Sequence, residues 1–225
     1  MEQSFHMSES IRLGAILALS GGLMDAYSYA QRGGVFANAQ TGNMIKLGLA
    51  LSSGDFQTAL NYLFPILSFA LGILLADVVC VRKDKLANLH WRQVTVLAEA
   101  VILVIVSRIP ASGDRLANTL TSLACGIQVE SFRKVHGHAA ATTMCIGNLR
   151  SGTENLHRFL LTREEGCLKV ALLYYGIIVC FVSGAVFGNA MVERMHQNAI
   201  LCSSAMLVIA FFVMGECGAL HAYKK

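Results

Sequence analysis

The stretch GGVFANAQTGNMIKLGL, residues Gly33–Leu49, decides how the fold is predicted, because the chain contains it a second time in weaker form. The second copy is HAAATTMCIGNLRSGT, residues His138–Thr153. Both copies hold a Gly-Asn step that opens a short apolar run, and the two steps coincide when Asn43 is aligned with Asn148. We therefore expect two related halves, each organised around one such step.

An acidic residue precedes each Gly-Asn step at the same spacing. Continued backwards without a gap, the alignment places Asp25 on Glu130, and both residues lie inside hydrophobic segments. Each predicted half thus contains an acid in an apolar segment, a Gly/Ala-rich connection and a second, shorter apolar run. The acids and the Gly-Asn steps are therefore the first candidates for function.

The composition is that of an integral membrane protein. Of the 225 residues, 55% are hydrophobic and only 14% are charged, whereas roughly a quarter of the residues of a soluble domain are charged. The charges also gather between long apolar runs, as expected when lipid surrounds most of the chain. The sequence has no basic run interleaved with aromatic residues, so the net charge of +4 does not indicate a nucleic-acid partner.

Six segments are long and apolar enough, or nearly so, to cross about 30 Å of hydrocarbon, which takes roughly 17–25 helical residues. We expect a single all-α transmembrane domain over residues 1–225, with one half at about 11–110 and the other at about 114–218. The third and fourth segments are the shortest and should form a helical hairpin. The six segments are Ile11–Ala30, Asn61–Val81, Val94–Ile109, Leu116–Phe132, Leu168–Met191 and Asn198–Gly218.

The lysines and arginines between these segments indicate the topology. The Val81–Arg92 loop carries four of them and the Arg133–Lys169 connection six, whereas the loops on the other side hold fewer. Because cytoplasmic loops are enriched in Lys and Arg, both termini are expected in the cytoplasm. Each half has three spans, an odd number, so the halves must enter the membrane in opposite directions. This is the inverted-repeat plan of many secondary transporters.

Two further segments, Val35–Leu51 and Ala139–Leu161, are neither full spans nor ordinary loops, since each is apolar with polar residues embedded in it. Apolar runs of this length suit re-entrant pieces. A re-entrant half-helix directs its free N–H groups at the middle of the membrane, where Thr41 and Asn43 would cap them or share them with a ligand. Gly42 and its counterpart in the second half would allow close backbone approach. The alternative is an amphipathic helix lying flat at the membrane interface.

These motifs resemble those of the YoaK-like family, a domain-of-unknown-function family of small bacterial membrane proteins with relatives in fungi. The resemblance covers almost the whole chain; it implies about six membrane-spanning helices in a bacterial cytoplasmic membrane and supplies no biochemical activity. Ile146, Glu130 and Lys46 depart from the family pattern. The resemblance rests on Gly22-Leu-Met-Asp25-Ala26, Gly33-Gly34-Val35-Phe36, Thr41-Gly42-Asn43, Leu47-Gly48-Leu49-Ala50-Leu51, Cys125-Gly126-Ile127-Gln128, Arg133-Lys134, Thr142-Thr143 and Gly147-Asn148-Leu149.

Carboxylates inside apolar segments carry the functional signal, because an ionisable group near the bilayer centre costs about 2.5–3.5 kcal/mol or more. Glu99 in particular must face the bundle, a cavity or a cation such as Lys46. We expect the polar residues of both halves to gather around the pseudo-two-fold axis. The candidate substrate- or ion-binding residues are Asp25, Asn38, Thr41, Gly42, Asn43, Glu99, Gln128, Glu130, Thr143 and Asn148.

Such a centre would bind a small polar or anionic solute, so the sequence predicts a transporter or channel in the lipid bilayer, with or without proton coupling through the carboxylates. The alternative is a network of interhelical hydrogen bonds, each worth less than about 2 kcal/mol, that only holds the bundle together. The protein would then be a non-transporting one, either an intramembrane enzyme or a structural or assembly factor.

The remaining motifs indicate no catalytic residues, cofactor or metal. The sequence contains no GxSxG, HExxH or Walker-type phosphate loop, and no nucleophile–base spacing suggests an enzyme. His136-Gly-His138 has no acid or cysteine ligand nearby, which favours a solvated connection over a metal site. The seven cysteines form no CxxC pair and should pack as small hydrophobic residues. Gly184-xxx-Gly188 is a helix-contact motif that serves within one chain or between the chains of a homo-oligomer.

Overall fold

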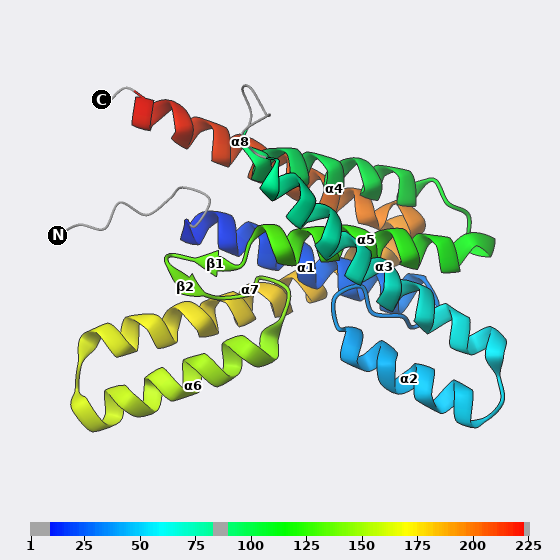
Figure 1. Ribbon diagram of the computed structural model, residues 1–225, viewed down its shortest axis with the longest axis horizontal. Helices are drawn as coiled ribbons and strands as arrows, with labels where there is room; N and C mark the ends of the chain where they lie inside the picture. The colour runs from blue at the N-terminus through cyan, green and yellow to red at the C-terminus, as the bar shows by residue number, and fades with distance from the viewer. Residues whose placement is uncertain (1–9, 83–89, 223–225) are drawn as a thin grey trace.

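The computed structural model describes residues 10–82 and 90–222 of the chain, with side chains up to residue 215. Within this part almost everything is helical, as expected, apart from one two-stranded hairpin (Figure 1). The helices are α1 Ile11–Gln31, α2 Gln40–Ser52, α3 Phe56–Val81, α4 Trp91–Ser107, α5 Asp114–Ser131, α6 Cys145–Thr162, α7 Glu165–Met195 and α8 Ile200–Ala222, with short 3-10 turns η3 Ala111–Gly113 and η4 His196–Ala199. The strands are β1 Lys134–Val135 and β2 His138–Ala139.

All six segments predicted to span the membrane form helices, namely α1, α3, α4, α5, α7 and α8. The third and fourth are the shortest, with 17 residues in α4 and 18 in α5. Two continuous helical stretches in the described residues are long and apolar enough by themselves to cross a membrane, each with a mean hydropathy of 2.3. They are Phe56–Val81, which is α3, and Glu165–Gly215, which combines α7, η4 and most of α8.

Helices of the first half pack mainly on helices of the second half. α1 lies along α7, α3 lies along α5, and α4 lies along α8. At the first two crossings the backbones touch. A Cβ atom on any of four glycines would fall within 2.3 Å of a carbonyl oxygen of the partner helix: Gly22 and Gly184 where α1 crosses α7, and Gly72 and Gly126 where α3 crosses α5.

The contact motif Gly184-xxx-Gly188 therefore serves inside the chain. A Cβ atom at Gly188 would lie 2.9 Å from the Cα atom of Leu23 on α1, and Gly184 faces Leu19 one turn earlier on the same helix. Small residues let helix backbones approach closely, which is how helices associate where lipid removes the hydrophobic driving force.

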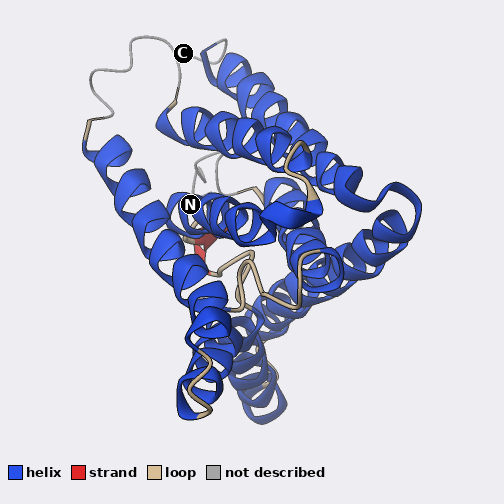
Figure 2. Cartoon of the chain, turned by 90° about the vertical axis from the view of Figure 1, so that its right-hand side faces the viewer, coloured by secondary structure: helices blue, strands red, loops and turns tan. Residues whose placement is uncertain are grey.

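The two short helices occupy a different position from the rest. Both α2 and α6 begin near the middle of the molecule and run outward to opposite ends, each packed on the helix that follows it (Figure 1). In the end-on view, the loops that lead into them lie among the helices instead of around the outside (Figure 2). α2 begins at Gln40 and α6 at Cys145, within three residues of the two Gly-Asn steps.

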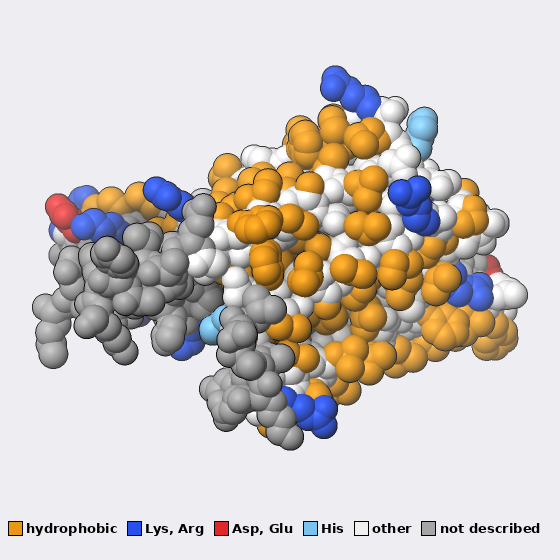
Figure 3. Space-filling view, turned by 90° about the horizontal axis from the view of Figure 1, so that it is seen from above, with side chains coloured by type: hydrophobic (Ala, Val, Ile, Leu, Met, Phe, Trp, Pro, Cys, Tyr) orange, Lys and Arg blue, Asp and Glu red, His pale blue; other side chains and the backbone are white. Residues whose placement is uncertain are grey.

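Much of the outer surface is apolar. Exposed leucine, isoleucine and valine side chains cover the outer faces of α3, α4 and α7, including Leu74, Val101 and Val179. Figure 3 shows hydrophobic side chains spread over the middle of one face, with Lys and Arg side chains mostly toward its edges. This distribution is the one that a helical bundle surrounded by lipid requires.

The hairpin between α5 and α6 was not anticipated from the sequence. Its two-residue turn has positive φ at both positions, 50° at His136 and 80° at Gly137, as in the type I′ turn that suits short hairpins. Val135 packs on α1, where its methyl groups lie 2.8–3.0 Å from the position of a Cβ atom at Gly14. The His-Gly-His motif is thus a turn, and the described residues contain no group of three or more potential metal ligands.

Arg32 comes just after the first predicted span, in a loop of the expected topology, yet its side chain is among the most deeply buried in the described residues. Its guanidinium makes five hydrogen bonds, all with the Tyr27 hydroxyl and the α4–α5 hairpin. The hairpin groups include the Asp114 carboxylate at 2.9 Å and the Ile109 carbonyl at 2.8 Å. Every N–H of the guanidinium is therefore used, and the end of α1 is fixed to the turn between α4 and α5.

Candidate substrate or ion site

The site begins where Asp25 on α1 meets the loop that leads into α2. The backbone N–H of Asn38 donates to Asp25 Oδ1 at 2.7 Å, and the N–H groups of Ala37 and Ala39 also face the carboxylate. These donors precede the first turn of α2, where the helix dipole favours a negative charge. Asp25 itself therefore occupies the donors that the sequence analysis had assigned to capping residues or a ligand.

Asn43 holds the same loop from the other side. Its amide oxygen accepts from the Phe36 N–H at 3.0 Å, and its Nδ2 donates to the Phe36 carbonyl at 2.7 Å. Asn43 thus pairs with both backbone groups of a residue seven positions earlier, as a neighbouring strand would. It is not an N-cap: the cap of α2 is Ala39, which provides no side-chain hydrogen bond, and Thr41 is exposed.

The glycines beside the two asparagines differ. A Cβ atom at Gly42 would lie 2.8 Å from the Phe36 ring, so this position needs a glycine. Gly147 has no atom within 4 Å of the corresponding position, so the expectation of close backbone approach does not hold there.

The second half repeats the asparagine contact. Asn148 Nδ2 donates to the Ala141 carbonyl at 2.7 Å, again across seven residues, and the Asn148 side chain is buried. The N-cap of α6 is Met144, which likewise provides no side-chain hydrogen bond. Both short helices thus begin after a loop that an asparagine from their own first turn holds in place.

The loops from the two halves meet on one face of α1. Asn38 Nδ2 donates to the Gly21 carbonyl at 3.1 Å, and Gln128 Nε2 on α5 donates to the Leu17 carbonyl at 3.1 Å. From the second loop, Thr143 Cγ2 lies 3.0 Å from the position of a Cβ atom at Gly21. Leu17, Gly21 and Asp25 are each one turn apart. The structure therefore brings Asp25, Asn38, Gln128 and Thr143 together, and we call these four residues the α1 cluster.

Glu130 does not join the α1 cluster. Although it aligns with Asp25, it forms an ion pair with Arg133, three residues later at the end of α5. The local pair removes the carboxylate from the axis, so the two aligned acids occupy different environments.

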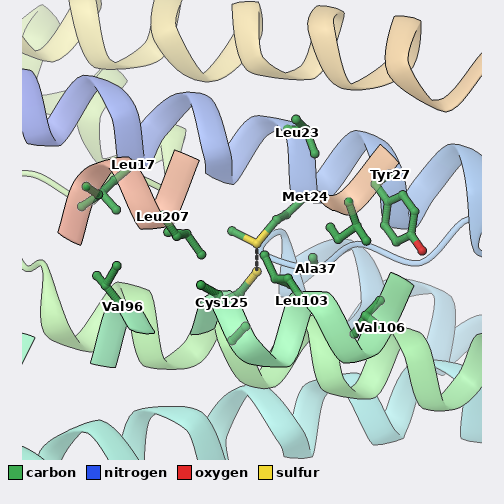
Figure 4. Close-up of a cluster of buried hydrophobic side chains, with 14 of the residues drawn as sticks. Leu17, Leu23, Met24, Tyr27, Ala37, Val96, Leu103, Val106, Cys125 and Leu207 are labelled. Carbon is green, nitrogen blue, oxygen red and sulfur yellow. Dashed lines mark hydrogen bonds between the residues drawn. The ribbon is translucent and has the colours of Figure 1, made fainter. Parts of the chain in front are cut away.

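Glu99 is completely buried on the inner face of α4, with Val96 and Leu103 one turn away on either side. Figure 4 shows Val96 and Leu103 in the apolar cluster that holds Met24 and Cys125. Neither carboxylate oxygen of Glu99 has a hydrogen-bond partner within the described residues. A carboxyl group in such surroundings has to be neutral or be matched by a cation.

Lys46 is not the partner of Glu99. Its ammonium donates to the Gly34 carbonyl and lies 4.8 Å, 5.0 Å and 5.6 Å from the ring centres of Tyr29, Phe36 and Tyr62. These three rings provide cation–π contacts that hold the charge on the outer side of the loop. No local pattern predicts this arrangement, because the rings come from three separate segments.

Cys125 links the two buried acids. It lies on α5 beside Asn38, in the region between Asp25 and Glu99. Its thiol contacts the Met24 sulfur at 3.8 Å, as drawn in Figure 4. The sequence predicts Cys125 as a packing residue and does not predict the contact of the Thr142 hydroxyl, which accepts from Gln128 Nε2 at 3.5 Å.

The apolar surface and the glycine-mediated crossings are those of a helical membrane protein. Comparison with known proteins agrees: residues 13–213 match the model of the family described as "Protein of unknown function (DUF1275)", and the chain belongs to that family. It is 26% identical over 211 residues to the UPF0700 transmembrane protein YoaK of Bacillus subtilis (strain 168), which covers 90% of this chain and 92% of that protein. No solved structure matches the chain. The resemblance to the YoaK-like family is confirmed, and the chain is an integral membrane protein.

Proposed function

We propose that the protein is a transporter or channel for a small polar solute, built as a single domain of two inverted halves with six spans. In this arrangement α2 and α6 are re-entrant half-helices that enter from opposite sides of a bacterial cytoplasmic membrane, and both termini are cytoplasmic. Non-helical backbone at membrane depth is tolerated only where protein buries it or where it lines a cavity. The loops before α2 and α6 meet this condition, since Ala37, Asn38 and Thr143 are buried.

The packing supports the relation between the halves. Exchanging the halves replaces α1 by α5, α3 by α7 and α4 by α8. The contact between α1 and α7 then corresponds to the contact between α5 and α3, and the contact between α4 and α8 corresponds to itself. The main contacts between the halves are therefore symmetric. The contacts from Asn43 to Phe36 and from Asn148 to Ala141 also exchange, with the same donor–acceptor distance of 2.7 Å.

The observation that carries the functional proposal is the α1 cluster. Polar groups from the loops before α2 and α6 and from α5 meet on one face of α1, beside a carboxylate that backbone N–H groups hold in place. Secondary transporters with inverted repeats place their substrate and coupling-ion sites at such a position, at the ends of discontinuous helices.

The chemistry of the cluster limits the class of solute that it would bind. Asp25 already faces the N–H donors before α2, so an anion would depend on the start of α6 alone. We therefore favour a neutral or cationic polar solute over the anion that the sequence also allowed. The two buried carboxyl groups, Asp25 and Glu99, would supply proton coupling if the transport cycle uses it.

A binding screen followed by a flux assay tests the proposal. Thermal unfolding of the detergent-purified protein would be measured with amino acids, sugars, nucleobases and small ions, because a ligand well above its Kd raises apparent stability by a few kcal/mol. The best ligand would then be followed into proteoliposomes. Asp25→Asn should lose binding and flux while remaining folded, whereas Glu154→Gln, at an exposed ion pair on α6, should keep both. If no solute binds and Asp25→Asn is merely less stable, the protein has a structural or assembly role instead.

A further inference from the structure

We propose that the α1 cluster binds a small monovalent cation, sodium or potassium. The assignment of this ion as the solute or the coupling ion rests on the proposed transport function. The binding itself is argued from the unpartnered oxygen atoms of the cluster, from its charge and from the types of ligand that it offers.

The unpartnered polar atoms of the cluster are oxygens. Asn38 Oδ1, Gln128 Oε1 and Thr143 Oγ1 are buried without a hydrogen-bond partner in the described residues. The orientation of the two amides is fixed, because Asn38 Nδ2 and Gln128 Nε2 each donate to a carbonyl oxygen of α1. An amide turned the other way would set oxygen against oxygen, so the free atom is the acceptor in both cases.

The charge of the cluster also favours a cation. Asp25, the carboxylate of the cluster, lies one helical turn from Gly21 on α1 and next to Asn38. The next two cations after Asp25 in the sequence are engaged elsewhere: every N–H of the Arg32 guanidinium donates a hydrogen bond, and the Lys46 ammonium lies among three aromatic rings. A buried carboxylate without a compensating charge is costly. A bound cation would supply that charge and satisfy the free oxygens together.

The ligand types favour an alkali cation over a metal ion of higher charge. The cluster offers one carboxylate together with neutral amide and hydroxyl oxygens. Calcium sites typically combine several carboxylates, and zinc or copper sites need histidine or cysteine ligands. In the described part of the chain no three residues of these kinds are grouped. In inverted-repeat transporters, unwound backbone at discontinuous helices coordinates sodium.

The test measures thermal unfolding of the full-length protein in detergent, in sodium, potassium or choline chloride at equal ionic strength. We expect one alkali cation to raise the apparent Tm in a saturable way relative to choline. Thr143→Val removes an unpartnered hydroxyl with little change of shape, so in choline it should be at least as stable as wild type. It should raise the half-saturating cation concentration by about tenfold, which corresponds to a ligand worth about 1.4 kcal/mol.

Gln128→Met should weaken the cation effect in the same way, and Thr153→Val, at an exposed position on α6, should leave it unchanged. Equal Tm values of the wild type in all three salts would overturn the inference, as would a cation effect that neither cluster variant reduces. The outcomes separate the two proposals. Solute binding without any cation effect would refute only the cation site, and a cation effect lost in the variants, with no solute flux, would refute only transport.

Discussion

The crossing of α1 and α7 predicts that Gly22→Ala is strongly destabilising. The added Cβ atom would lie 1.9 Å from the carbonyl oxygen of Phe181 and 2.9 Å from the backbone nitrogen of Ala185. Restoring an ordinary carbon–oxygen contact of about 3.3 Å requires the two backbones to separate by about 1.4 Å. The obstacle is backbone, so no side-chain rotation relieves it, and a gap of even 0.5–1 Å forfeits about a quarter to a half of each dispersion contact.

Overpacking of a well-packed site typically costs about 1–3 kcal/mol, and we expect Gly22→Ala at the top of that range. On the scale of a 150–250-residue domain, about 3 kcal/mol corresponds to a fall in Tm of roughly 6–12 °C. The matched control is Gly176→Ala on α7, where no atom lies within 4 Å of the new Cβ. Alanine at this position should be neutral or slightly stabilising, because it is the better helix former.

The assay is thermal unfolding of both variants and the wild type in one detergent, with size-exclusion chromatography to check that each remains monodisperse. The reasoning would be refuted if Gly22→Ala unfolded at the same temperature as Gly176→Ala. That result would mean that α1 and α7 do not touch through their backbones at this point.

Three further predictions concern single residues. Arg32→Lys keeps the charge but has three donors on one nitrogen in place of five, so at least two of the five acceptors lose their partner. Thermal unfolding should show a loss of about 2–3 kcal/mol. Glu99→Gln removes an unpartnered carboxyl group from the core and should be at least as stable as wild type at pH 7.5; a clear loss of Tm would reveal that the carboxylate has a bound counter-charge. The hydrogen bonds from the side chain and backbone N–H of Thr58 lower the pKa of Asp55 from 3.8. Asp55 is the N-cap of α3, and its contribution to stability is fully present above pH 3.8 and is lost as the pH falls through the lower pKa of the folded state. Asp55→Ala should therefore be less stable than wild type at pH 7, and the difference in stability should shrink in acid.

The helices were predictable because their signals are local. Each of the six apolar segments formed a helix, and the starts of α2 and α6 fell close to the Gly-Asn steps. The role of Asn43 and Asn148 was not predictable in detail. A cap bonds to donors two or three residues away, whereas these amides reach back seven residues to a loop whose path depends on the rest of the bundle.

The partners of the charged residues could not be read from spacing. Asp25 and Glu130 align, yet Glu130 has a cation three residues later and Asp25 has none nearby, so only Asp25 turned to the backbone donors before α2. Arg32 looked like a loop residue because its five acceptors come from Tyr27 and from the distant α4–α5 hairpin. Burial by segments far away in the sequence decides the environment of Arg32, and no local pattern encodes it.

The central claim is that the two halves enter the membrane in opposite directions, with α2 and α6 returning to opposite sides. Single cysteines at Ser53, after α2, and Glu165, at the start of α7, test it, since both positions are exposed. They would be introduced into a chain from which the native cysteines have been removed, and labelled in intact cells with a membrane-impermeant thiol reagent. The account predicts labelling of Ser53→Cys from outside and of Glu165→Cys only after the membrane is opened. Labelling of both from the same side would contradict the inverted arrangement and the transport proposal built on it.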